Sequence, residues 1–136
     1  MTSIQIEKVI DLWRSDGIKL SPPLTVELIK EAEEILSFQF PEDFKQFYLK
    51  LDGFVDWDWT SNMFSMWPLA RIVEEYRCES DKNFIVFADY LINSHHLGFV
   101  KGRYGVFKND CIVYELIAGD FSETVALINA DSITLY

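Results

Sequence analysis

Residues 40–53 read FPEDFKQFYLKLDG and decide the fold. Apolar side chains recur there at i, i+3, i+4 and i+7, the spacing of one helix face: Phe44, Phe47, Tyr48 and Leu51. Pro41 suits the first position of such a helix, because its missing N–H would be unpaired there anyway. Glu42 and Asp43 suit the positive end of the helix dipole, and Gly53 suits the position just past the C-terminus. The stretch therefore predicts a capped helix with one buried face.

Two more helices are predicted before this one. The first carries apolar residues at helical spacing and is closed by Gly17: Ile6, Val9, Ile10 and Trp13. Ser21-Pro22-Pro23 is a rigid break, and Thr25 is a good N-cap for the second helix, with Glu27 in its first turn. This second helix is expected to reach about residue 36 with one apolar face: Leu28, Ile29, Ala32, Ile35 and Leu36.

After Gly53 the pattern changes to that of strands. Residues 54–67 read as strand or loop, and a short helix is expected over Ala70 to Arg77. Further strands are predicted at residues 84–87, 98–101, 104–108 and 111–117, the last two flanking Asn109-Asp110 as a hairpin. Asp120 with Glu123 then caps a final helix. Helices followed by a mostly antiparallel meander, with one helix returning to pack on the sheet, predict an α+β fold.

The chain has the size of one domain, and its charge restricts the partners it can bind. Its 136 residues include 22 acidic and 12 basic ones, for a net charge of −10 spread along the whole chain. Such a field repels nucleic acid and anionic membranes, and it attracts a basic partner. Solubility alone is an equally good reading of the same charge. Composition therefore leaves recognition and solubility both open.

The N-terminus and the cysteines indicate a cytoplasmic protein. No basic segment followed by an apolar stretch stands at the N-terminus, and no run approaches the roughly 18 apolar residues needed to span a bilayer. Cys78 and Cys111 form no CxxC element and are expected to be buried, reduced thiols. We therefore predict a cytoplasmic location.

Residues 40–53 also resemble the characteristic helix of the SUKH superfamily, of the Smi/Knr type. That helix reads L-P-x-D-[FY]-x-x-[FY] and is followed by N-G; here Phe40 stands where Leu is usual, and Asp52 where Asn is usual. Other motifs agree in the same order over residues 24–128: Ile29, Glu33 and Ile35 on the preceding helix, Trp67-Pro68-Leu69 with Ile72, the strand 84–87, the hairpin 104–114, and Ile117 to Glu123 at the start of the last helix. In that last motif, Asp120 and Thr124 replace the customary Ser and Phe.

The resemblance implies a binding protein and no enzyme. Many bacterial members of the family are immunity proteins that neutralise toxins, often nucleases, whereas fungal members are regulatory interaction modules. The leading expectation is therefore an immunity protein that binds a cognate, basic, nuclease-type toxin domain and occludes its active site. A regulatory or scaffolding module of the same fold, with no toxin partner, is the alternative.

The partner-binding surface is predicted in two acidic segments. Residues 56–59 read Asp-Trp-Asp-Trp; if extended, they place two carboxylates on one face and two indoles on the other. Each tryptophan taken alone is expected in the core, but in a loop the two indoles would be exposed anchors for a partner. Glu74 and Glu75 extend the acidic surface, which would mimic nucleic-acid phosphates to a nuclease. The predicted partner-binding residues are Asp56, Trp57, Asp58, Trp59, Glu74 and Glu75.

Other candidate chemistry lacks the required spacing. Asp52, Asp56 and Asp58 do not have the spacing of an EF-hand loop. His95-His96 are expected in a turn, without the HxxxH or HExxH spacing of a metal site. The six glycines form no phosphate-binding loop. The sequence therefore predicts no cofactor, no metal, and no direct nucleic-acid or membrane partner, and it leaves the oligomeric state open.

Overall fold

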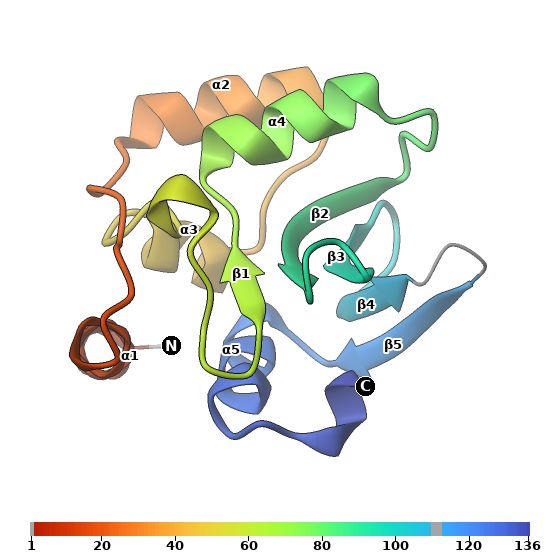
Figure 1. Cartoon of the computed structure of the whole chain (residues 1–136). Coiled ribbons are helices and arrows are strands. Elements are labelled where there is room, and N and C mark those ends of the chain that lie inside the picture. Colours follow the sequence, from red (N-terminus) through yellow and green to blue (C-terminus); the bar gives the residue numbers. More distant parts are fainter. Residues whose placement is uncertain (1, 110–112) are drawn as a thin grey trace.

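The computed structural model describes residues 2–109 and 113–136, and its elements follow the predicted order (Figure 1). Three helices come first: α1 (Ser3–Ser15), α2 (Val26–Leu36) and α3 (Glu42–Tyr48). The short strand β1 (Phe64–Met66) then leads into α4 (Leu69–Cys78). Four strands and a final helix follow: β2 (Phe84–Tyr90), β3 (His95–Val100), β4 (Val106–Asn109), β5 (Tyr114–Ala118) and α5 (Phe121–Asn129).

The five strands form one antiparallel sheet in the order β1-β2-β3-β4-β5. Neighbours in the sheet are therefore neighbours in the chain, and among the described residues only α4 interrupts the meander, between β1 and β2. Figure 1 shows α4 lying beside α2 and packing over β2. The predicted α+β class, with a meander and a C-terminal helix on the sheet, is confirmed.

One face of the sheet is covered by α3 and α5 through an aromatic cluster. Phe44 of α3 contacts Phe99 and Phe121, with ring centroids 5.6 and 5.1 Å apart. Phe121 of α5 reaches Phe87 on β2 at 5.2 Å. The residues of 40–53 that point inward are all fully buried, as their helical spacing predicts. This is why that segment fixes the layer arrangement.

The opposite face of the sheet carries a smaller apolar cluster. Phe84, Val100 and Phe107 are buried there, with Val86 and Tyr114 packed against them. Phe84 lies directly opposite Val100 across β2 and β3, whereas the alternate residues of β3, Leu97 and Phe99, belong to the main core. Only part of this second face lies under α4, and the candidate site is built there.

The helix signals are confirmed with one shift. Thr25 accepts a hydrogen bond from the N–H of Leu28 at 3.3 Å, and Asp120 accepts one from Glu123 at 2.7 Å. Pro41, however, is the N-cap of α3 and not its first residue, because its ψ of 151° is extended. The helix begins one residue later, at Glu42.

Gly53 serves a close backbone approach and does not end the helix. α3 ends at Tyr48, five residues earlier. Gly53 has a φ of +65°, and a Cβ there would lie 2.5 Å from the carbonyl carbon of Trp67. Only glycine fits both conditions.

The structure corrects four expectations about loops and burial. Residues 56–59 take the loop alternative, with a 3-10 turn at Val55–Trp57, and both tryptophans are exposed, although each taken alone was expected in the core. His95-His96 begin β3, and the turn precedes them at residues 91–94. Cys78 is exposed, whereas Cys111 and the hairpin residue Asp110 lie outside the described residues. Leu28 and Ile35 on the expected buried face of α2 are exposed toward α4, because α4 leaves a groove there.

Candidate partner-binding site

The site is organised around Arg71, which reaches from α4 between two tryptophan rings. Its guanidinium carbon lies 3.8 Å from the ring centroid of Trp57 and 4.0 Å from that of Trp67. Trp67 is buried directly before α4, whereas Trp57 comes from the 3-10 turn and is 57% exposed. Stacking of this kind is favourable because the ring face is electron-rich, so Arg71 holds Trp57 in place at the surface.

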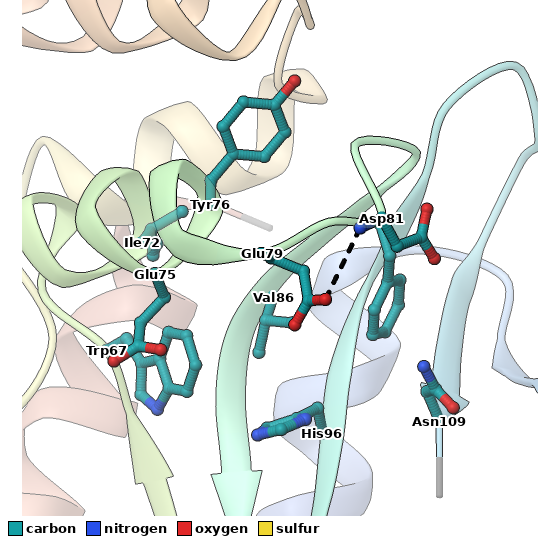
Figure 2. A pocket seen from close by; sticks show the side chains of 10 residues that line it. Trp67, Ile72, Glu75, Tyr76, Glu79, Asp81, Val86, His96 and Asn109 are labelled. Atoms are coloured by element: carbon teal, nitrogen blue, oxygen red, sulfur yellow. Dashed lines mark hydrogen bonds between the residues drawn. The ribbon is translucent and has the colours of Figure 1, made fainter. Parts of the chain in front are cut away.

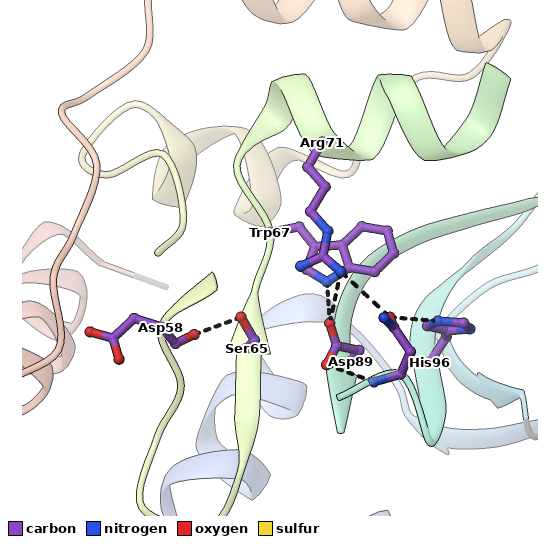
Figure 3. A network of polar contacts seen from close by, with 7 residues as sticks. Asp58, Ser65, Trp67, Arg71, Asp89 and His96 are labelled. Atoms are coloured by element: carbon purple, nitrogen blue, oxygen red, sulfur yellow. Dashed lines mark hydrogen bonds and ion pairs between the residues drawn. The ribbon is translucent and has the colours of Figure 1, made fainter. Parts of the chain in front are cut away.

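Asp89 of β2 provides the counter-charge for Arg71 (Figure 3). Its Oδ2 accepts a hydrogen bond from Trp67 Nε1 at 2.6 Å and lies 3.3 Å from Nη2 of Arg71. Its Oδ1 accepts from the backbone N–H of Asn93 at 3.3 Å. Asp89 is buried, and Nε of Arg71 is buried without a hydrogen-bond partner in the described part of the chain. One carboxylate thus joins α4, β1's end and the turn after β2.

Two loops rest on this network in unusual backbone conformations. Leu91, Ile92 and Asn93 all have positive φ values, of 50°, 52° and 65°. Asn93 holds the turn through two contacts. Its backbone N–H donates to Asp89, and its side-chain oxygen lies 3.2 Å from Nε2 of His96. Trp57 is also left-handed, with a φ of 63°. Non-glycine residues in this region cost free energy, and such strain gathers at functional sites.

The loops expose an apolar surface, which we call the tryptophan surface and define as Trp57, Trp59 and Ile92. These residues are 57%, 46% and 68% exposed. They surround a small hollow of about 80 Å³ whose floor includes Arg71 and Asp89. Large side chains held apart from the core over a rigid charged floor are typical of interface anchors.

A second hollow, the acidic pocket, opens between α4 and strands β2, β3 and β4 (Figure 2). Its volume is about 350 Å³. Its carboxylates come from α4 and from the connection to β2: Glu75, Glu79 and Asp81. Its remaining walls are mostly apolar: Trp67, Ile72, Tyr76, Phe84, Val86, His96 and Asn109. Trp67 therefore belongs both to this pocket and to the Arg71 network.

Comparison with known protein families identifies the family of this chain. The model of the SMI1 / KNR4 family (SUKH-1) matches residues 23–128, most of the chain. The protein belongs to the SUKH-1 family. The match begins just before α2 and ends within α5, so it includes α4, the sheet and both hollows. SUKH-1 proteins are generally not catalysts. A comparison with the curated proteins gives no match.

The SUKH-1 fold brings together only part of the predicted surface. Trp57 and Trp59 meet at the tryptophan surface, and Glu75 lines the adjoining acidic pocket. Glu74 lies on the other side of α4, where it borders the groove toward α2. Asp56 is exposed, whereas Asp58 is half-buried and accepts the N–H of Lys19 at 2.8 Å.

The described residues of this SUKH-1 chain do not assemble other candidate chemistry. They contain no group of three or more His, Cys, Asp or Glu side chains that could hold a metal ion. Asp52 is directed to α4, where it accepts the N–H of Leu69 at 2.7 Å. None of the described helices is long and apolar enough to cross a membrane.

Burial changes the titration of two groups near α4. It lowers the pKa of His96 below its usual 6.5, against the opposing effect of Asp89 and Glu75. At neutral pH this ring is therefore uncharged. Burial also raises the pKa of Asp52 above 3.8, although the hydrogen bond from Leu69 opposes the shift.

Sequence reasoning missed Arg71 and Asp89, which hold the site together. They are 18 positions apart, and no local pattern pairs them. One signal was present: Asp89 follows the apolar run 84–88, which is expected to be buried and where an acid needs a partner. Arg71 gave a weaker signal. It lies next in sequence to Ile72, which forms the apolar face of α4 together with Leu69, and one turn before Glu75.

Proposed function

We propose that this protein is an immunity protein that binds a cognate toxin domain and occludes its active site in the cytoplasm. Membership of the SUKH-1 family supports this reading. The observation that carries it is the exposure of Trp57, an indole held on Arg71 with more than half its surface in water. Trp57 lies in the 3-10 turn Val55–Trp57 and stacks on Arg71, so the anchor is in place before the partner arrives.

The tryptophan surface offers enough apolar area to bind a protein. Trp57 and Trp59 each leave about half of their surface in water. Covering roughly 100–140 Å² on each would contribute roughly 2.5–3.5 kcal/mol at about 25 cal/mol per Å². Not all of this becomes affinity, because association also costs translational freedom and ordering of side chains. Two such anchors are typical of an interface hot spot.

Charge complementarity favours a basic toxin, such as a nuclease. The chain carries −10 overall, and the acidic pocket borders the tryptophan surface through Trp67. A field of this sign accelerates encounter with a basic partner and repels nucleic acid itself. The protein then needs no catalytic group, because covering the toxin's active site is sufficient.

Co-expression with the toxin encoded next to this gene tests the proposal. The wild-type protein should restore growth, and a Trp57→Ala, Trp59→Ala double variant should lose rescue and bind at least about 30-fold more weakly, as expected for hot-spot residues. Ile133→Ala is the matched control, because Ile133 is also exposed but lies in the C-terminal turn.

Failure of the wild-type protein to rescue growth would remove the immunity function and favour the regulatory module. Rescue by the double variant, at the wild-type level, would instead place the binding surface elsewhere. Association should also slow as salt is raised, since the Debye length falls from about 10 Å at 0.1 M to about 3 Å at 1 M. An on-rate that is indifferent to salt would contradict the charge mechanism.

A further inference from the structure

We propose that the acidic pocket receives an arginine side chain of the protein partner. The proposal rests on the proposed function only in that the ligand belongs to a protein. The proposal adds a second contact beside the tryptophan surface and names the side chain that makes it. Neither family membership nor the exposed indoles specify that side chain.

The size of the pocket fits one long side chain. A volume of about 350 Å³ lies at the small end of the range of about 300–1,000 Å³ for ligand pockets. Figure 2 shows the hollow bounded by α4 on one side and by β2 and β3 on the other, with Glu75, Glu79 and His96 around it. A helix or strand of a partner does not fit such a space, whereas a side chain projecting from a loop does.

The ionised side chains that line the pocket are acidic. Three carboxylates line it, and within the described part of the chain no lysine or arginine does. Two are held by the turn after α4: Glu79 Oε1 accepts the N–H of Ser80 at 3.0 Å, and Asp81 Oδ1 accepts that of Asn83 at 3.0 Å. Each of these bonds uses one oxygen of its carboxylate. A cation entering the pocket would meet acceptors that are already in position.

Among the described residues, the cations near the pocket form no ion pair with its carboxylates. His96 lines the pocket, but burial lowers its pKa, so the ring is uncharged at neutral pH. Lys82 and Lys101 lie over the ring of Tyr76, where they donate to its backbone carbonyl and to its hydroxyl. Arg71 lies against Trp67 and is paired with Asp89, and its charge also interacts with that of Glu75. The carboxylates of the pocket can therefore still pair with a cation of a partner.

The walls favour arginine over lysine. Trp67 and Phe84 provide aromatic surface beside the carboxylates, whereas the ring of Tyr76 is already covered by Lys82 and Lys101. A planar guanidinium stacks on such rings and forks toward carboxylates, whereas a compact ammonium is more strongly hydrated. The same protein already uses this combination once, where Arg71 stacks on Trp67 and pairs with Asp89. The acidic pocket offers the same combination of aromatic ring and carboxylate, and the partner would supply the arginine.

Titration of the full-length protein with N-acetyl-arginine amide, followed by NMR, tests the pocket without any toxin. We expect saturable shifts at the indole N–H of Trp67 and the amide of Val86. N-acetyl-citrulline amide has nearly the same shape without the charge and should give no saturable shift. N-acetyl-lysine amide should bind more weakly than the arginine compound.

Neighbouring glutamates supply the matched variants. Glu75→Gln should weaken binding about tenfold, as expected when a charged hydrogen-bond partner is neutralised. Glu74→Gln removes the same charge one residue away but faces the α2 groove, so it should leave binding unchanged. Both residues are exposed, so both variants should fold. Glu79→Gln provides a second pocket variant, with the same expected weakening.

Three results would overturn the pocket: no saturable shift with the arginine compound, equal shifts with citrulline, or equal weakening by Glu74→Gln and Glu75→Gln. Lysine binding as tightly as arginine would overturn the choice of side chain. The two proposals fail separately. Loss of toxin rescue with an intact arginine titration removes the immunity function alone, whereas rescue without arginine binding removes the pocket alone.

Discussion

Replacing Asp89 with asparagine should destabilise the protein strongly, because the substitution keeps the shape and removes the charge. The carboxylate accepts from Trp67 and Arg71 on one oxygen and from the N–H of Asn93 on the other. An asparagine side chain has one acceptor and one donor end. Whichever way it is oriented, its NH₂ faces a donor, and Arg71 loses its counter-charge.

The magnitude follows from burial. The side chains of Arg71 and Asp89 are only 11% and 5% exposed, so solvent does little to replace the lost partner. Removing one member of a buried pair costs about 3–5 kcal/mol. An unfolding entropy of about 2.1 cal/mol/K per residue gives about 0.29 kcal/mol/K for this chain, so the melting temperature should fall by about 10–17 °C. This is a large share of the usual total stability of about 5–15 kcal/mol.

Urea and thermal unfolding followed by circular dichroism measure the effect. Glu115→Gln is the control, because Glu115 forms an ion pair with Lys108 at 3.3 Å but is 63% exposed, and its loss should cost no more than about 0.5 kcal/mol. Combining Asp89→Asn with Arg71→Met should cost less than the sum of the single changes. A loss below about 1 kcal/mol for Asp89→Asn, or full additivity with Arg71→Met, would refute this account of the network.

Three further predictions concern glycine geometry and pH. Gly53→Ala should cost several-fold more stability than Gly102→Ala. Both glycines have positive φ, but only a Cβ at Gly53 would meet the Trp67 backbone. Equal losses in urea unfolding would contradict the clash. Asp52→Asn should match or exceed wild-type stability at pH 7 and lose that advantage below pH 3.8. Burial raises the folded pKa of Asp52, so the wild-type protein loses stability as rising pH ionises this carboxyl, and asparagine avoids that loss. Reduced stability of the variant at pH 7 would contradict this. Burial lowers the folded pKa of His96, so the unfolded state gains the proton first and the free energy of unfolding should fall as pH drops through 6.5. For His96→Gln, stability should depend less steeply on pH between 7.5 and 5.5. An unchanged slope would exclude His96 as the cause.

Local signals predicted the fold because they act over a few residues. The apolar spacing around Phe44 identified α3, and the side chains of Thr25 and Asp120 identified the starts of α2 and α5. Strand order followed from short connections, since consecutive strands usually pair. These features depend on neighbours in the chain, and the sequence contains those neighbours.

The site was less accessible because its partners are distant in sequence. Trp57 is exposed but fixed because Arg71, 14 positions later, offers a flat cation to stack on. The turn at Leu91 and Ile92 uses apolar left-handed residues where turns usually have glycine or asparagine, so the pattern favoured a turn at the histidines instead. Glu74 and Glu75 are adjacent in sequence but lie on two sides of α4, and which side faces which hollow depends on tertiary packing.

The left-handed turns described above also affect the thermodynamics of recognition. Backbone freedom at Trp57 and at Leu91 to Asn93 is already lost in the free protein, because Asp89 and Arg71 hold both loops. Ordering flexible loops on association usually subtracts from affinity, and preorganised loops avoid that entropic cost. The folding free energy of the domain therefore bears the cost of shaping this surface, and a partner meets it as a rigid template.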